Sequence, residues 1–146
     1  ILRRFWRFIL FAALVDFISD FIPFFYVYVM TLINTGNPEL SATTARTVAF
    51  TSIVFFEFIL AYQCRSETKH IFQLGWEGLT ANKMLFVSVV VGLTLQMLIL
   101  YVPFLNEVFH VVPLTPFQLG LCALGSFTAL LIIPQRLIPK RVYVEH

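Results

Sequence analysis

One carboxylate stands alone inside an apolar run of this chain, in the segment VFFEFILAYQCRSE at residues 54–67. The charged residues nearest to Glu57 are Arg46 and Arg65, about 16 Å and 12 Å away along a helix that rises 1.5 Å per residue. Glu57 is therefore expected near the midplane of a bilayer. A charge there costs at least about 2.5–3.5 kcal/mol, and such residues commonly face a bundle interior and mark an ion or proton path.

The helix that carries Glu57 offers it no second ligand. The neighbours on the same face are Ile53, Val54, Leu60 and Ala61, none of which has a side-chain oxygen. Hard cations such as calcium take six to eight oxygen ligands, so a metal site at Glu57 needs ligands from other helices. Two alternatives are a protonated glutamate hydrogen-bonded between helices and a glutamate that faces a further helix only for packing.

A second pair of carboxylates, Asp16 and Asp20, lies four residues apart in LVDFISDFIPFF and hence on one helix face. Counted from Arg7, they lie about 14 Å and 20 Å along the helix, inside the apolar slab. Two carboxylates so close together should not both be ionised there. The pair could serve as a proton or cation relay. The preferred interpretation is a polar side of a long tilted helix, or a contact with a further helix.

The composition of the chain indicates a membrane protein. Hydrophobic residues make up 59% of the 146 positions and charged residues 12%, and the mean hydropathy is +0.85. So few polar residues cannot cover a soluble core of this size. The net charge of +2 and the scattered basic residues exclude a nucleic-acid partner. The opening at Ile1 does not resemble a signal peptide, and the chain reads as a fragment.

Four apolar runs are long enough to cross a bilayer, so we expect an all-α integral membrane protein. The runs cover residues 8–33, 47–63, 84–101 and 117–134. Segments rich in Gly, Pro and Asn separate them, for example NTGNPEL at residues 34–40. The prediction is one transmembrane domain over residues 1–146, folded as an antiparallel four-helix bundle.

The basic residues predict the orientation of these spans, because Lys and Arg near span ends are retained in the cytoplasm. Nine of them flank one side, whereas the opposite side holds only Arg46. Both termini are therefore expected in the cytoplasm. The nine are Arg3, Arg4, Arg7, Arg65, Lys69, Lys83, Arg136, Lys140 and Arg141.

Other side chains within the spans predict packing rather than chemistry. Cys64 and Cys122 are expected at opposite ends of the bundle, too far apart for a disulfide, and hence as free thiols. Gln96 is predicted to hydrogen-bond between helices, with contact to a transported solute as the alternative. Gly125 and Ala129, four residues apart, suit a close approach of two helices in lipid.

The segment ARTVAFTSIVFFEFILAYQCRSE, residues 45–67, resembles the eighth membrane helix of cation-transporting P-type ATPases, particularly the calcium-pump branch. Residues 71–86, IFQLGWEGLTANKMLF, look like that family's short cytoplasmic loop. Residues 98–118, LILYVPFLNEVFHVVPLTPFQ, are similar to the end of the ninth helix and the following loop. Residues 45–116 carry the resemblance by motif, and the rest of the chain carries it by hydropathy and order.

The resemblance implies that the four spans are helices seven to ten of a pump. Glu57 then matches the eighth-helix glutamate that gives a carboxylate oxygen to a cation site, with calcium as the expected ion and with the other ligands on helices four to six. Leu60 stands where the family often has Asn or Asp. The motifs DKTGT and TGE do not occur in the chain, so no catalytic residue or cofactor is assigned to it and Mg-ATP would bind to other domains.

Two functions from other classes remain open at this stage. The chain could be a self-standing four-helix membrane scaffold, in which its carboxylates are protonated hydrogen bonders. It could also be a small ion- or proton-conducting protein built around Asp16, Asp20 and Glu57. Its expected partners are the lipid bilayer and, as part of a pump, the remaining transmembrane helices and cytoplasmic domains.

Overall fold

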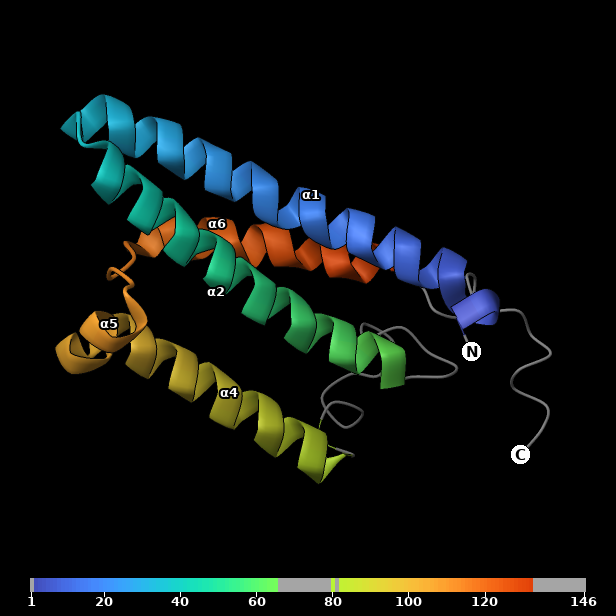
Figure 1. Ribbon diagram of the computed structural model, residues 1–146. Helices are drawn as coiled ribbons and strands as arrows, with labels where there is room; N and C mark the ends of the chain where they lie inside the picture. The colour runs from blue at the N-terminus through green and yellow to red at the C-terminus, as the bar shows by residue number, and fades with distance from the viewer. Residues whose placement is uncertain (1, 66–79, 81, 133–146) are drawn as a thin grey trace.

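The computed structural model describes residues 2–65, 80 and 82–132. Every element in these ranges is helical, which confirms the all-α prediction (Figure 1). Three helices are long and apolar enough to cross a membrane, and one apolar stretch, Pro116–Leu131, is shorter. The elements are α1 (Leu2–Thr35), α2 (Pro38–Arg65), α4 (Lys83–Tyr101), α5 (Pro103–Phe109), α6 (Pro116–Ser126) and the 3-10 helix η1 (Phe127–Leu131).

The connection between α1 and α2 is much shorter than the loop expected at residues 34–40. Gly36 adopts a left-handed conformation with φ of +65°, which a glycine tolerates without steric cost. The Asn37 side chain accepts hydrogen bonds from the backbone N–H groups of Glu39 and Leu40, at 3.0 and 3.2 Å. Because Asn37 caps the helix and Pro38 fits its first position, α2 begins nine residues before the expected residue 47.

The other expected span boundaries agree with the helices of the structure to different degrees. The third span agrees within one residue, since α4 covers Lys83–Tyr101. The fourth changes from α6 to η1 at Phe127, and its helical part ends at Leu131, whereas the prediction ran to residue 134, outside the described residues. The short helix α5 was not predicted. Pro103 belongs to a segment that was expected only to separate two spans, but it occupies the first turn of α5, where a missing N–H is tolerated.

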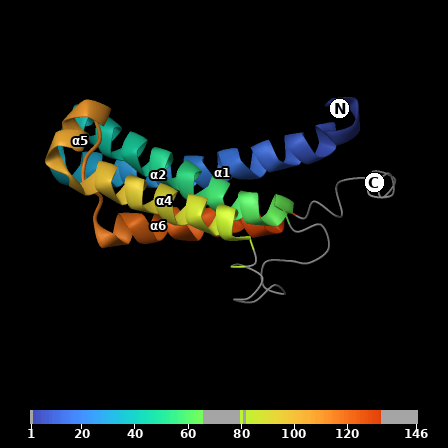
Figure 2. The same cartoon turned by 90° about the horizontal axis from the view of Figure 1, so that it is seen from below.

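Helices α1, α2 and α6 pack side by side, and α4 lies along another side of α2 (Figures 1 and 2). Helix α1 continues through Pro23, which is buried against Gly125 of α6. A Cβ atom built on Gly125 would lie 3.1 Å from the backbone oxygen of Ser19 and 3.5 Å from Pro23 Cγ. Ala129, one turn later, is fully buried. The predicted small-residue contact of the last span is therefore confirmed.

The face of α2 that packs against α1 and α6 is lined largely by small polar residues. Ser41, Thr44, Thr47, Thr51 and Ser52 are all buried and recur at helical spacing. Most of their hydroxyls donate to the carbonyl one turn earlier, for example Thr51 Oγ1 to the oxygen of Thr47 at 2.9 Å. A hydroxyl satisfied within its own helix lets two helices approach without an unpaired polar group.

The segment between α4 and α6 is fixed to the end of the bundle at which α1 and α2 are joined (Figure 1). Tyr101 donates its hydroxyl to the oxygen of Leu114 at 3.0 Å. The backbone N–H of Val112 donates to Thr47 Oγ1 at 3.2 Å. Leu114 is 3% exposed and clusters with Val48 and other core residues of α1, α4 and α6. This loop is thus part of the packed core.

The Gly125 contact generates a stability prediction. Changing Gly125 to Val should destabilise the protein by about 1–3 kcal/mol, because the helix backbone at Ser19 cannot easily move away. The matched control is Gly120→Val on the same helix, where a Cβ atom meets nothing within 4 Å. Thermal unfolding in detergent, followed by circular dichroism, should separate the two variants. Equal melting temperatures for both would contradict the close contact.

Candidate functional site

Glu57 lies in the middle of an exposed stripe on α2. The stripe recurs every three or four residues and faces away from the buried hydroxyl face; it consists of Arg46, Phe50, Ile53, Glu57, Ala61 and Cys64. Among the described residues, no hydrogen bond or ion pair involves the Glu57 carboxylate. The carboxylate belongs to an open face of the structure.

Asp16 and Asp20 lie beside this stripe, on the neighbouring helix. They line a groove of about 360 Å³ whose α2 wall includes Ala49 and Ile53, and Ile53 is one turn before Glu57. Both aspartates lie within electrostatic range of Glu57. One oxygen of each is buried without a hydrogen-bond partner among the described residues. The structure therefore places the three predicted carboxylates on adjoining parts of one α1–α2 surface.

These carboxylates do not form a complete cation site by themselves. Within the described ranges, no group of three or more His, Cys, Asp or Glu side chains is placed to hold a metal ion. The sequence has no Lys or Arg between Arg7 and Arg46 or between Arg46 and Arg65, so no basic residue within these segments neutralises them. A cation bound at Glu57 would need oxygen ligands from outside these helices.

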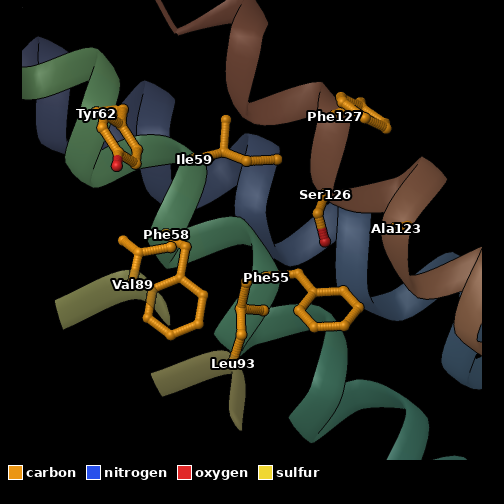
Figure 3. Close-up of a pocket in the computed structure, with 9 residues that line it drawn as sticks. All are labelled: Phe55, Phe58, Ile59, Tyr62, Val89, Leu93, Ala123, Ser126 and Phe127. Atoms are coloured by element: carbon orange, nitrogen blue, oxygen red, sulfur yellow. The ribbon is translucent and has the colours of Figure 1, made fainter. Parts of the chain in front are cut away.

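A separate cavity of about 280 Å³ lies between α2, α4 and the last span, and its lining is almost wholly apolar (Figure 3). Phe55, Phe58 and Tyr62 contribute from α2, while Val89 and Leu93 come from α4. The Ser126 hydroxyl at its edge already bonds the backbone oxygens of Ser52 and Cys122, at 3.1 and 2.6 Å. The cavity has no charged group, so it is not a candidate cation site.

The remaining predicted polar residues have structural partners. Gln96 is 3% exposed and donates from Nε2 to Thr51 Oγ1 at 3.0 Å, which confirms the interhelical hydrogen bond. Cys64 and Cys122 are both free thiols, exposed and buried respectively, as predicted. Cys122 also donates to the oxygen of Val48 at 3.5 Å.

Sequence reasoning missed Gln63, which is buried at the far end of α2. Its Nε2 lies 3.2 Å from the oxygen of Leu130 and 3.4 Å from that of Ile132. These carbonyls belong to the end of η1, where helical partners are lacking. The apolar neighbours of Gln63 could have indicated a buried amide, but its partner residues depend on where the last span stops being helical.

Comparison with known proteins shows a match between residues 1–136 and the family model described as "Cation transporting ATPase, C-terminus". The chain belongs to this family. The match covers nearly the whole sequence, including the first and last spans, where the resemblance depended on hydropathy and order. No solved protein structure matches the chain.

Individual relatives in this family are calcium-transporting ATPases. "Calcium-transporting ATPase type 2C member 2" of Rattus norvegicus is 40% identical over 75 residues, which are 50% of this chain and 8% of the relative. "Calcium-transporting ATPase 1" of Saccharomyces cerevisiae is 34% identical over 84 residues, 58% of this chain and 8% of the relative. "Calcium-transporting ATPase type 2C member 1" of Bos taurus is 35% identical over 89 residues, 61% of this chain and 9% of the relative.

These matches confirm the calcium-pump-like resemblance. The chain spans less than a tenth of the length of these relatives. It is the C-terminal transmembrane region of a cation-transporting P-type ATPase and an integral, multi-pass membrane protein. Within it, the long apolar helices fit a lipid bilayer.

The hydrogen bond between Gln96 and Thr51 generates a second prediction. A double-mutant cycle of Gln96→Leu and Thr51→Val should give a coupling energy of about 0.5–1.5 kcal/mol, the range of interhelical hydrogen bonds in membranes. Thermal unfolding of the four proteins in detergent measures it. The control partner is Thr94→Val on α4, because Thr94 is exposed and its hydroxyl bonds only Val90 of its own helix. Similar coupling for Thr94 and Thr51 would refute the assigned bond.

Proposed function

We propose that this chain is part of a calcium pump and that Glu57 supplies a carboxylate oxygen to the transported ion. The observation that carries this proposal is the position of Glu57 on an exposed stripe of α2, without a partner among the described residues. A carboxylate facing lipid at mid-depth is costly. The cost falls when other helices cover the stripe and bring further oxygen ligands around a shared cation.

The rest of the stripe supports such a cover. Ile53 and Ala61, one turn before and after Glu57, are exposed apolar or small residues, against which another helix can pack closely. The face on the opposite side of α2 is already filled by α1 and α6. Helices that complete the ion site would therefore dock on the Glu57 side. Under the resemblance, these are helices four to six of the pump.

The proposal includes the arrangement of the chain in the membrane. The four helices would form an antiparallel bundle within one transmembrane domain, with both termini in the cytoplasm. The tight α1–α2 connection and the placement of α5 at the same end of the structure support this arrangement. Phosphorylation and the binding of Mg-ATP would belong to domains outside this chain.

Calcium is the proposed ion because the named relatives are calcium-transporting ATPases. Glutamate oxygen is a hard ligand suited to calcium. Leu60, on the helical turn after Glu57, stands where the family often has Asn or Asp and supplies no side-chain oxygen, so this position would give the ion no ligand. Asp16 and Asp20 lie within electrostatic range of Glu57, and either of them in its ionised form would lower the electrostatic potential around the bound cation.

Replacing Glu57 with Gln in the full-length pump tests the proposal directly. The amide keeps the size of the side chain but loses the negative charge that attracts the cation. We expect the calcium concentration for half-maximal phosphorylation from ATP to rise by about tenfold or more, equivalent to about 1.4 kcal/mol of binding free energy. Phosphoenzyme formation over a calcium titration measures this change.

The matched control is Glu107→Gln, which makes the same chemical change at an exposed residue of α5. Its calcium dependence should equal that of the unmodified protein. Phosphorylation of both proteins from inorganic phosphate, which needs no calcium, tests whether the pump is folded. An unchanged calcium dependence in a folded Glu57→Gln protein would remove Glu57 from the ion site.

A small ion- or proton-conducting role is a second candidate, supported by the placement of Asp16, Asp20 and Glu57 on one surface. If the chain conducts by itself, the purified protein in liposomes should collapse an imposed proton gradient. Replacing Asp16 and Asp20 with Asn should then abolish the flux. A silent preparation would contradict this role, while the pump proposal predicts that outcome.

A further inference from the structure

The short helix α5 leaves an apolar surface at the end of the bundle. Phe104 is 72% exposed, Val108 57% and Phe109 51%. At 100° per residue these three side chains and Leu105 fall within an arc of about 140°, and Asn106 and Glu107 lie opposite. Helix α5 is thus amphipathic, with its apolar side open and a carboxylate on the other side.

The orientation of this surface is fixed by hydrogen bonds. Asn106 Nδ2 donates to the oxygen of Ile99 in α4 at 2.6 Å, so the polar side of α5 turns back toward α4. His110 ends the helix in a left-handed conformation with φ of +52°, and its N–H donates to the backbone oxygens of Asn106 and Glu107. The following loop is held through Val112 and Leu114, as described above. The outward direction of Phe104 and Val108 therefore follows from the fold.

The position of α5 relative to α4 indicates what covers this surface. Helix α4 has 19 residues, about 28 Å of helix, which matches a hydrocarbon core of about 30 Å. The charged Lys83 begins α4, so Tyr101 at its other end falls near the opposite boundary of the bilayer. Only Val102 separates Tyr101 from α5. Phe104 is therefore within one turn of the membrane interface.

The apolar surface of α5 also continues the exposed side of α4. Val87, Val91, Leu95 and Leu98 are each more than 40% exposed and recur every three or four residues, ending near Tyr101. In a multi-pass membrane protein, such an uncharged stripe on a helix of membrane-spanning length is suited to contact lipid. Phe104 and Val108 extend it beyond the end of the span; no charged residue lies between Leu98 and Phe104, and Glu107 lies on the other side of α5.

We propose that α5 is an interfacial membrane helix whose Phe104, Val108 and Phe109 side chains insert among the lipids at the end of the bundle where α1 and α2 are joined. Amphipathic helices of this kind lie in the plane of the interface with their apolar face buried in the headgroup–acyl boundary. Because one residue links α5 to α4, this contact would fix the depth of that end of α4. The inference does not depend on the ion site at Glu57.

Site-specific photocrosslinking tests this proposal. The photoreactive p-benzoylphenylalanine is placed singly at positions 104, 107 and 91 of the full-length protein in cell membranes, and adducts are identified by mass spectrometry after irradiation. Position 91, on the exposed side of α4, is the control for lipid contact. We expect lipid adducts at 104 in a yield similar to that at 91 and several-fold above that at 107. Polypeptide adducts at 104, or lipid adducts at 91 without any at 104, would overturn the proposal.

A second measurement avoids the bulky crosslinker. Phe104→Cys and Glu107→Cys are introduced separately and exposed to a membrane-impermeant maleimide on the side of the membrane where α5 lies. Glu107→Cys should react several-fold faster, because its thiol faces water. Equal rates would contradict insertion of the Phe104 side.

Discussion

A hydroxyl or amide inside hydrocarbon has no water to bond, and the arrangement of these helices follows from how α2 satisfies its own polar groups. Ser and Thr side chains along its buried face return their hydrogen bonds to the preceding turn. This face can then lie against α1 and α6 at short distance, with Gly125 permitting the closest approach. Among the described residues, the side chains of Gln63, Gln96, Cys122 and Ser126 make the hydrogen bonds between α2 and other helices. The core is consequently tight although its residues are small.

The two sides of α2 therefore differ in whether their polar groups have hydrogen-bond partners among the described residues. Most hydroxyls on the buried side have hydrogen bonds within the chain, whereas the exposed side carries Glu57 without a partner among the described residues. The carboxylates of Asp16 and Asp20 adjoin that exposed side. A helix bundle that completes its packing on one side and leaves a charge open on the other is suited to join a larger assembly. The match to a C-terminal pump region is consistent with this asymmetry.

Much of this could be predicted from the sequence because hydropathy and length decide which segments are helices. The third span was placed within one residue, and Gln96 was correctly assigned a partner on another helix. The helix ends were predicted less well. They depend on capping hydrogen bonds from single side chains, those of Asn37 and Thr115, which hydropathy does not reveal. Helix α5 was missed because Pro103 both ends one helix and begins another.

The candidate site was also predicted in part from hydropathy. A lone carboxylate in an apolar run is conspicuous, so Glu57 could be identified from its neighbours. Its relation to Asp16 and Asp20 could not, because adjacency between two helices depends on how each is rotated. The rotation of α1 is constrained in part by the contact of Ser19 and Pro23 with Gly125 of α6, a contact that is not visible in any one segment.

The two-residue connection at Gly36 and Asn37 bears on how the chain enters a membrane during synthesis. Because only Gly36 and Asn37 link them, α1 and α2 are suited to enter the bilayer together as a helical hairpin, in which each helix satisfies its own backbone. Asp16, Asp20 and Glu57 would then enter the bilayer together with the apolar surface of both helices. A longer turn would allow α1 and α2 to enter the bilayer separately. Each helix would then insert its own carboxylates without the apolar surface of the other.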